Sequence, residues 1–234
     1  MIYNDSFEYL NSDYHTENRV IENFYEPSRI YDLGLPDLLD MEIGFINGMA
    51  NFFEDAQKSA RYLSRLAGGY NIHAVYNATH GSPVDARECG MGLNYVATEP
   101  VRQLHKMWNS FFDRASANAR YLMICHSQGA IHVRNALLDY PPTLRERILV
   151  VAIAPGGYIY QQTCADLFHY RAMPWRDFIP RIDRKGAKRE KNTIVDLISH
   201  TKANTFDHEF TSLTYMETLQ RHINNYLKSE GKEI

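Results

Sequence analysis

The chain has 234 residues, enough for one large domain or two small ones, and enough to bury a sizeable core without metals or disulfides. Hydrophobic residues make up 44% and charged residues 23%, which excludes a wholly disordered chain, a collagen and a coiled coil. The formal charge of −3 implies no general affinity for nucleic acid, and no apolar run is long enough to span a membrane.

The N-terminal residues 1–40 are expected to form an acidic extension of the domain. They hold seven more acids than bases, and Pro27 and Pro36 break any long helix there. Residues 171–191, in contrast, hold five more bases than acids. The simplest interpretation of both blocks is a solvated surface. The alternative for the stretch from Arg181 to Lys191 is contact with phosphates or with an anionic membrane surface.

From residue 41 onwards, strands and helices are predicted to alternate. The most apolar stretch, ILVVAIA at 148–154, suits a parallel strand covered on both faces, while the spacing of Leu104, Trp108 and Phe111 is helical. Strands are predicted at 41–46, 70–76, 121–125, 148–154, 167–172 and 193–199, and helices at 51–66, within 95–118, at 128–139 and at 213–228. This alternation indicates an α/β fold over 41–234, with a mostly parallel central sheet and helices on both faces.

The most informative segment is CHSQG at residues 125–129, between a buried strand and a helix. This is the context of a nucleophile elbow, G-x-S-x-G, in which a tight turn lifts the serine hydroxyl out of the sheet. The helix beginning at Gln128 then places backbone N–H groups and the positive end of its dipole beside Ser127. Cys125 departs from the motif, because it replaces a glycine. The alternative is a serine in an ordinary strand-to-helix turn.

The strand, the CHSQG turn and the helix resemble the α/β-hydrolase superfamily, over about residues 41–229. In lipases of this superfamily, the residue after an apolar-His-Gly turn donates one N–H to the oxyanion hole. The segment from Ile46 to Met49 is similar to that turn, with Asn47 in place of histidine. The resemblance implies an oxyanion hole made by the backbone N–H groups of Met49 and Gln128. A plain Asn-Gly turn is the alternative.

The superfamily order of serine, acid and histidine implies an acid after the strand at 167–172. Asp177, in the segment DFIP, is similar to the aspartate in the D-x-V-P segment of class 3 lipases and is the expected acid. Asp183 is the second candidate. The alternative for Asp177 is a surface aspartate paired with Arg176 or Arg181.

The histidine is expected between the last strand and the last helix, where His208 and His200 are the candidates. A base must reach back over the serine from a loop, so His208 is preferred and His200 is expected to be structural. Phe206 and Phe210 flank His208 and are expected to pin its loop to the core.

Other chemistry is not indicated. His126 is expected to point away from Ser127, and His132 and His169 to be structural. There is no H-E-x-x-H motif, no paired cysteine spacing and no glycine-rich phosphate loop, so neither a metal nor a cofactor is expected.

The expected location is the cytoplasm, or outside the cell after export without a cleaved signal peptide. Cys89, Cys125 and Cys164 are odd in number and far apart, which favours free thiols in a reducing compartment. The first residues include early acids and no basic stretch before an apolar one, so no secretory signal peptide is expected.

The predicted function is serine hydrolysis of a carboxylic ester or thioester, with Ser127, Asp177 and His208 forming and releasing an acyl-enzyme. The substrate would be a small-molecule or lipid acyl ester, and acyl transfer to an acceptor other than water stays open. The alternative is a catalytically inactive α/β-hydrolase-fold binding or scaffold protein, which Cys125 and Asn47 keep open. No oligomeric state is predicted.

A second resemblance concerns the setting rather than the chemistry. The run HSQGAIHVRNALLDYPP, with VVAIAPGGYI and FDHEF, looks like a family of uncharacterised proteins from chlamydia-like bacteria. This resemblance implies an intracellular bacterium and an exported effector as the setting.

Overall fold

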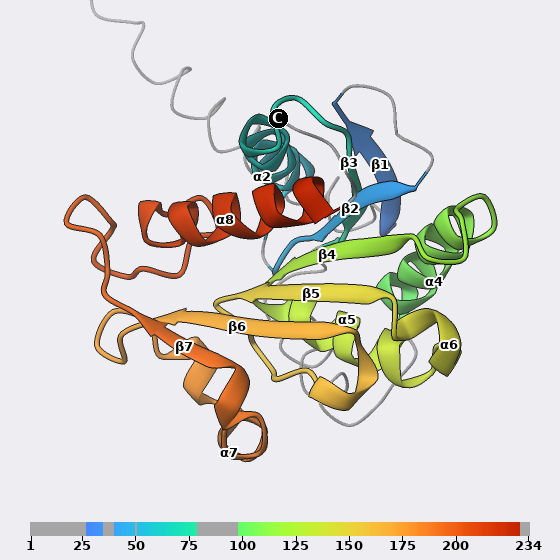
Figure 1. Cartoon of the computed structure of the whole chain (residues 1–234). Coiled ribbons are helices and arrows are strands. Elements are labelled where there is room, and N and C mark those ends of the chain that lie inside the picture. The colour runs from blue at the N-terminus through green and yellow to red at the C-terminus, as the bar shows by residue number, and fades with distance from the viewer. Residues whose placement is uncertain (1–26, 35–39, 50, 79–97, 230–234) are drawn as a thin grey trace, which may run out of the picture.

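A seven-stranded sheet forms the centre of the computed structural model, which describes residues 27–34, 40–49, 51–78 and 98–229 (Figure 1). The strand order is β1-β3-β2-β4-β5-β6-β7, and every neighbouring pair is parallel except β1 with β3. The strands are β1 (Arg29–Leu33), β2 (Met41–Ile46), β3 (Ile72–Tyr76), β4 (Arg120–His126), β5 (Ile148–Ile153), β6 (Asp166–Ala172) and β7 (Ile194–Leu197). The predicted α/β fold is confirmed.

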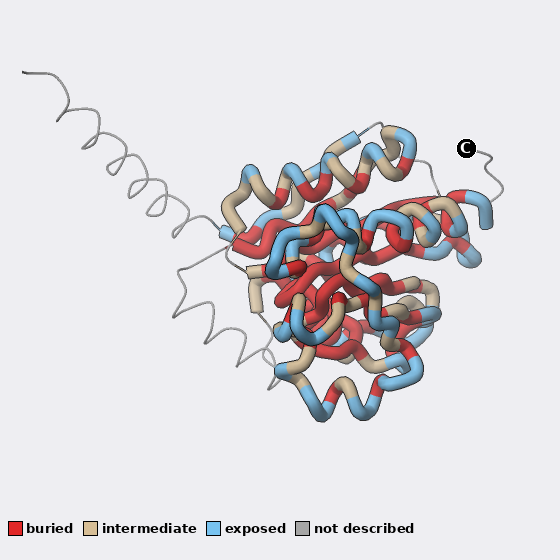
Figure 2. The backbone as a smooth tube through the Cα atoms, turned by 90° about the vertical axis from the view of Figure 1, so that its left-hand side faces the viewer, coloured by how far each residue is buried: buried red, intermediate tan, exposed pale blue. Residues whose placement is uncertain are grey.

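Helices cover both faces of the sheet. Helices α2 and α8 pack on one face and α4 and α5 on the other, so the buried strands lie between two helical layers (Figure 2). The helices are α2 (Phe53–Leu66), α4 (Glu99–Phe112), α5 (Gln128–Leu138), α6 (Pro142–Arg145), α7 (Arg184–Arg189) and α8 (Leu213–Ser229). Over the described ranges, no helix has both the length and the hydropathy needed to cross a lipid bilayer.

The central strand β4 is continuously apolar over residues 121–125, and its place in the sheet explains why. Successive side chains of a strand point to opposite faces. Met123 and Cys125 therefore pack in the core under α4 and α5, whereas Leu122 and Ile124 pack in the core under α2 and α8. A strand with helices on both faces needs apolar residues at every position, not at alternate ones.

The edges of the fold differ from the prediction. Strand β1 lies inside the expected N-terminal extension, yet it pairs with β3 from Arg29–Tyr76 to Leu33–Ile72 and so belongs to the sheet. The short helices α6 and α7 were not predicted either. These elements have only four to six residues and leave much of their length exposed, so they carry no strong hydrophobic period. Residues 1–26 of the expected extension lie outside the described residues.

His169 shows how the core holds a neutral histidine. Its Nε2 accepts the backbone N–H of Ile159 at 3.1 Å, so Nδ1 carries the hydrogen in its 2.7 Å bond with the hydroxyl of Thr193. Burial, and then the positive charges of Arg189 and Arg171, lower the pKa of His169 to about 3. Protonation of Nε2 would break the bond to Ile159.

We therefore expect the free energy of unfolding to fall as the pH falls from 7 to 5. The unfolded chain takes up a proton on this histidine near pH 6.5, whereas the folded chain does not, so His169 alone accounts for a loss of about 2 kcal/mol. Urea unfolding at the two pH values measures the loss. His169→Gln, which keeps an acceptor but cannot take up the proton, should lose about 2 kcal/mol less than the wild type between these pH values. A variant curve parallel to the wild-type curve would contradict this assignment.

Candidate active site

A cavity lies at the carboxyl ends of the strands, where the chain changes direction across the sheet. From β2 the chain passes to β3 on one side and then to β4 on the other. In α/β sheets, such a switch point leaves a crevice outside the strand ends. Here it has a volume of about 970 Å³, and its lining includes Asn47, Met49, His126, Ser127, Gln128 and His208.

Ser127 lies in the turn between β4 and α5 and has an unusual backbone conformation. Its φ of 51° and ψ of −121° fall outside the regions that non-glycine residues ordinarily adopt. The turn is packed closely on its neighbours: a Cβ at Gly129 would lie 2.8 Å from the carbonyl oxygens of Ile46 and Asn47. The backbone N–H of Gly156 also donates to the carbonyl of Ser127 at 2.8 Å. Contacts on both sides thus hold Ser127 in this conformation.

Cys125, the departure from the expected motif, is a core residue. Its side chain is fully buried, and its thiol lies 3.9 Å from the carbonyl oxygen of Val151. Burial, and then the neighbouring Cys164, raise the pKa of the Cys125 thiol. The sulfur therefore stays protonated and packs under α4 and α5 without disturbing the turn.

A chain of hydrogen bonds joins Ser127, His208 and Asp177. The hydroxyl oxygen of Ser127 lies 2.9 Å from Nε2 of His208, and Nδ1 of His208 lies 2.8 Å from Oδ2 of Asp177. The second carboxylate oxygen of Asp177 accepts the backbone N–H of Ile179 at 3.0 Å, and the residue is 1% exposed. A carboxylate only accepts, so Nδ1 of His208 carries the hydrogen and Nε2 can accept from Ser127.

The loop carrying His208 is held by the residue before it. The carboxylate of Asp207 accepts the hydroxyls of Ser212 and Thr214, both at 2.6 Å. Burial raises the pKa of Asp207, but the hydroxyl hydrogen bonds, those of Ser212 and Thr214 among them, outweigh that effect, and the pKa lies below its ordinary value. Asp207 therefore stays charged and fixes the backbone next to His208.

The two phenylalanines that flank His208 behave differently. Phe210 is buried against Phe45, with ring centroids 4.8 Å apart, and ties the loop to the core as expected. Phe206 was expected to do the same. Instead it is 46% exposed and stacks on the ring of His208 at 5.6 Å.

His126 was expected to point away from Ser127, and this prediction is wrong. Its side chain lines the same cavity, and its Nε2–H donates to the backbone carbonyl of His208 at 2.7 Å. Burial, and then the neighbouring His208, lower the pKa of His126 to about 3. His126 is therefore a neutral donor that positions His208. The contact spans 82 residues, so the sequence offered no signal for it.

The turn after β2 is built around Asn47. Its side-chain oxygen accepts the backbone N–H of Asn77 at 2.8 Å, and its amide donates to the carbonyls of Gly48 and Asn77 at 2.8 and 3.0 Å. The side chain of Asn77 in turn donates to Oε1 of Gln128 at 2.7 Å. A Cβ at Gly48 would lie 2.8 Å from Cβ of Ser127, so only glycine allows this approach. Met49 and Gln128 both line the cavity as a result.

The remaining candidates from the sequence lie elsewhere. Asp183 caps α7 and accepts the N–H groups of Gly186 and Tyr158 at 2.8 and 3.1 Å. His200 is exposed, and its Nδ1 accepts the N–H of Lys202. Cys89 lies outside the described residues. Within the described residues, no three His, Cys, Asp or Glu side chains are grouped in a way that could hold a metal ion.

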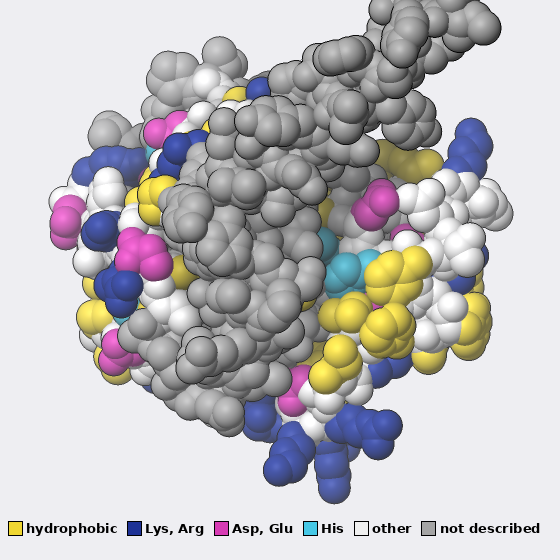
Figure 3. All heavy atoms as spheres, turned by 180° about the vertical axis from the view of Figure 1, so that it is seen from behind, with side chains coloured by type: hydrophobic (Ala, Val, Ile, Leu, Met, Phe, Trp, Pro, Cys, Tyr) yellow, Lys and Arg dark blue, Asp and Glu magenta, His cyan; other side chains and the backbone are white. Residues whose placement is uncertain are grey.

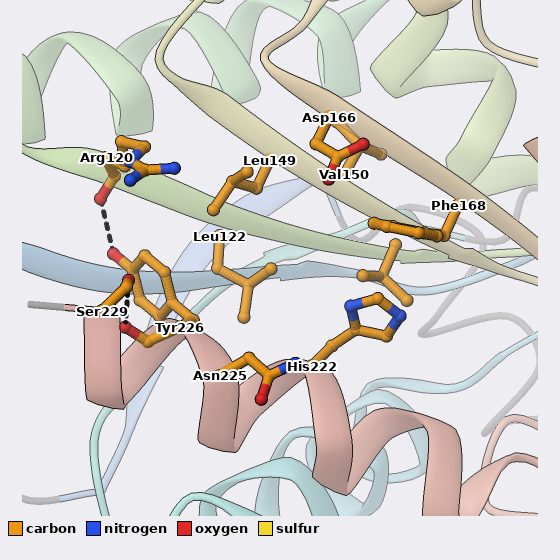
Figure 4. A pocket seen from close by; sticks show the side chains of 11 residues that line it. Arg120, Leu122, Leu149, Val150, Asp166, Phe168, His222, Asn225, Tyr226 and Ser229 are labelled. Atoms are coloured by element: carbon orange, nitrogen blue, oxygen red, sulfur yellow. Dashed lines mark hydrogen bonds between the residues drawn. The ribbon is translucent and has the colours of Figure 1, made fainter. Parts of the chain in front are cut away.

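A second, smaller cavity lies between α8 and the strands β4 to β6, and includes their amino-terminal ends (Figure 4). Its volume is about 230 Å³. Ser229 in this cavity donates to the carbonyl of Tyr226, and His222 bonds to the hydroxyl of Tyr170 at 2.8 Å. Burial and then Arg221 lower the pKa of His222 to about 4. This cavity lacks a serine bonded to a histidine, so the larger cavity is the candidate active site.

One family model matches most of the chain. A family model described as "Protein of unknown function (DUF687)" matches residues 30–209. The chain belongs to this family. The family description names no bacterial source, so the chlamydia-like setting stays a prediction. No curated protein matches the chain in sequence.

Solved structures share the fold at low sequence identity. An arylesterase structure has a TM-score of 0.51 at 9% identity and covers 97% of this chain and 99% of its own. A Pyrobaculum calidifontis esterase has a TM-score of 0.50 at 10% identity, covering 99% and 96%. Esterase E25 has a TM-score of 0.51 at 10% identity, covering 97% and 87%. The protein has the α/β-hydrolase fold.

Proposed function

We propose that this protein is a serine hydrolase that cleaves a carboxylic ester or thioester through Ser127, His208 and Asp177. The observation that carries the proposal is the hydrogen-bond chain that runs from Ser127 and His208 in the cavity wall to the buried Asp177, with contacts of 2.9 and 2.8 Å. A nucleophile, a base within hydrogen-bond reach and a group that orients the base are the minimal parts of acyl transfer. The strained turn at Ser127 matches a nucleophile elbow.

The reaction would proceed in two displacements. His208 Nε2 takes the proton of the Ser127 hydroxyl as the oxygen attacks the substrate carbonyl, and Asp177 stabilises the imidazolium that forms. The imidazolium then protonates the leaving alcohol or thiol, and the acyl group remains on Ser127. Water, deprotonated by the same histidine, attacks the acyl-enzyme and releases the acid.

The backbone N–H groups of Met49 and Gln128 would hold the negative oxygen of each tetrahedral intermediate. The close approach of Gly48 to Ser127 and the Asn47–Asn77 link support this role, because they hold the turn against the start of α5. Each preorganised donor of this kind lowers the barrier by about 3–4 kcal/mol.

The cavity suggests an apolar acyl group. Ile179, Ile182 and Phe206 belong to its lining, to which the polar Asn51 and Lys58 also contribute. A volume of about 970 Å³ is large enough for a drug-sized ester. The structural neighbours named as an arylesterase and as esterases support ester chemistry at the level of the fold.

Turnover of p-nitrophenyl esters of increasing acyl length tests the proposal. We expect a steady release of nitrophenol that requires folded protein and stops after treatment with a serine-directed phosphonate. Folded protein that releases no nitrophenol with any chain length, or that still turns over after phosphonate treatment, would overturn the proposal.

A further inference from the structure

An exposed apolar patch adjoins the mouth of the candidate active site. Its members are large side chains in contact with solvent: Trp175 is 75%, Phe178 60%, Ile182 60% and Phe206 46% exposed. The rings of Phe178 and Phe206 lie 5.5 Å apart, and Phe206 in turn stacks on His208. Ile182 and Phe206 also line the cavity, so the patch is continuous with its wall.

A basic cluster lies between two members of the patch in sequence, Ile182 and Phe206. Four of the eight bases at 171–191 are engaged within the fold: Arg171 and Arg181 pair with Asp196, Arg189 pairs with Glu190, and Arg176 donates to the carbonyls of Ala203 and Asn204. The other four are exposed on and just after α7, and in the described part of the chain none pairs with a carboxylate: Arg184, Lys185, Lys188 and Lys191.

Figure 3 shows the two features on one face of the molecule. Hydrophobic side chains (yellow) lie beside exposed histidine atoms (cyan), and a group of Lys and Arg side chains (dark blue) lies next to them. Isolated apolar residues on a surface are ordinary, but an apolar patch rimmed by unpaired bases is not. An anionic apolar phase would cover such a patch and pair with the exposed bases beside it.

We infer that this face docks on an anionic phospholipid surface and takes its ester from there, an inference that rests on the proposed function. Trp and Phe side chains bury well at the boundary between headgroups and acyl chains, while Lys and Arg side chains pair with anionic headgroups. Because Ile182 and Phe206 belong both to the patch and to the cavity wall, a docked membrane would meet the cavity mouth. An acyl chain could then enter without crossing water.

Vesicle sedimentation tests the inference without requiring turnover. We expect the protein to bind vesicles of phosphatidylcholine with added phosphatidylglycerol, and to bind phosphatidylcholine alone weakly. Lys185→Glu/Lys188→Glu should lower the affinity for anionic vesicles by at least about thirtyfold, since each surface base contributes a factor of about five. Phe178→Ser should lower it by about tenfold or more, because a buried aromatic side chain is lost from the interface.

A matched pair of charge reversals is the control. Lys106→Glu/Lys228→Glu changes the net charge equally, on exposed positions of α4 and α8, and should leave vesicle binding within about twofold. Lys185→Glu/Lys188→Glu should keep wild-type turnover of a soluble ester, because neither residue lines the cavity.

Three results would overturn the inference. They are equal binding to both kinds of vesicle, equal losses in the two double variants, and binding to polyglutamate without binding to vesicles, which would indicate an acidic protein partner. Vesicle binding without ester turnover would uphold the docking face and reject the proposed function. Ester turnover without vesicle binding would support the proposed function and reject the docking face.

Discussion

Ser127→Ala is expected to reduce kcat for ester hydrolysis by about 10⁶ with little change in thermal unfolding temperature. The described hydrogen bond of the Ser127 hydroxyl is to Nε2 of His208, so the change removes the nucleophile and leaves the packing intact. The backbone strain at φ 51° is the same for alanine as for serine. Purified wild type and variant would be compared by ester turnover and by thermal melting.

Ser64→Ala is the matched control for that prediction. The Ser64 hydroxyl donates to the carbonyl of Tyr70 at 2.9 Å, and Ser64 does not line the cavity. This variant should keep its kcat and lose about 1 kcal/mol of stability. The double variant Ser127→Ala/His208→Ala should be no slower than Ser127→Ala, because the two residues act in one step. A Ser127→Ala protein with more than about a hundredth of wild-type activity would contradict the mechanism.

Asp177→Asn is expected to reduce kcat by about 10⁴, although it removes no atom from the packing. The backbone N–H of Ile179 donates to Oδ1, so the amide oxygen of the asparagine should occupy that position. The amide nitrogen would then face Nδ1 of His208, which could only accept. His208 would be driven into the tautomer with its hydrogen on Nε2, and it could not take the proton of Ser127. Steady-state kinetics over a range of pH would measure the loss.

Asp183→Asn provides the comparison, since Asp183 was the second candidate for the acid. Its carboxylate accepts the backbone N–H of Gly186 in α7 at 2.8 Å and that of Tyr158 at 3.1 Å. An asparagine keeps one of these bonds, so we expect a loss of about 1 kcal/mol in stability and an unchanged kcat. If Asp177→Asn stayed within about tenfold of wild type, or if Asp183→Asn were the slower protein, Asp177 would not be the acid.

The fold class was predictable because the central strands β4 and β5 are apolar over five or six consecutive residues. Strand β5 lies between two other strands and under helices on both faces. Its sequence ILVVAI is an unbroken apolar run, which indicates burial on both faces. Strand β1 has neither property. It lies at the edge of the sheet with half-exposed residues, and its place depends on pairing with β3, some 40 residues later.

The candidate site was predictable where a local turn defines it. The turn at Ser127 is set by five consecutive residues. The superfamily order of serine, acid and histidine then indicates where in the chain the acid and the histidine lie. The supporting contacts were not predictable, because they join distant segments. His126 bonds to the backbone of His208, and Asn47 bonds to Asn77 across 30 residues. Such contacts depend on loop conformations, for which hydrophobic patterns carry no information.

Labelling with a fluorophosphonate, followed by intact-mass analysis and peptide mapping, tests the central claim most directly. The probe reacts rapidly with a protein when an activated serine oxygen attacks its phosphorus beside a functional oxyanion hole and displaces fluoride. The account predicts one adduct on folded wild type, mapped to Ser127, and none on Ser127→Ala. Folded wild type without an adduct, or with its adduct on another residue, would contradict the account and favour a non-catalytic binding protein with this fold.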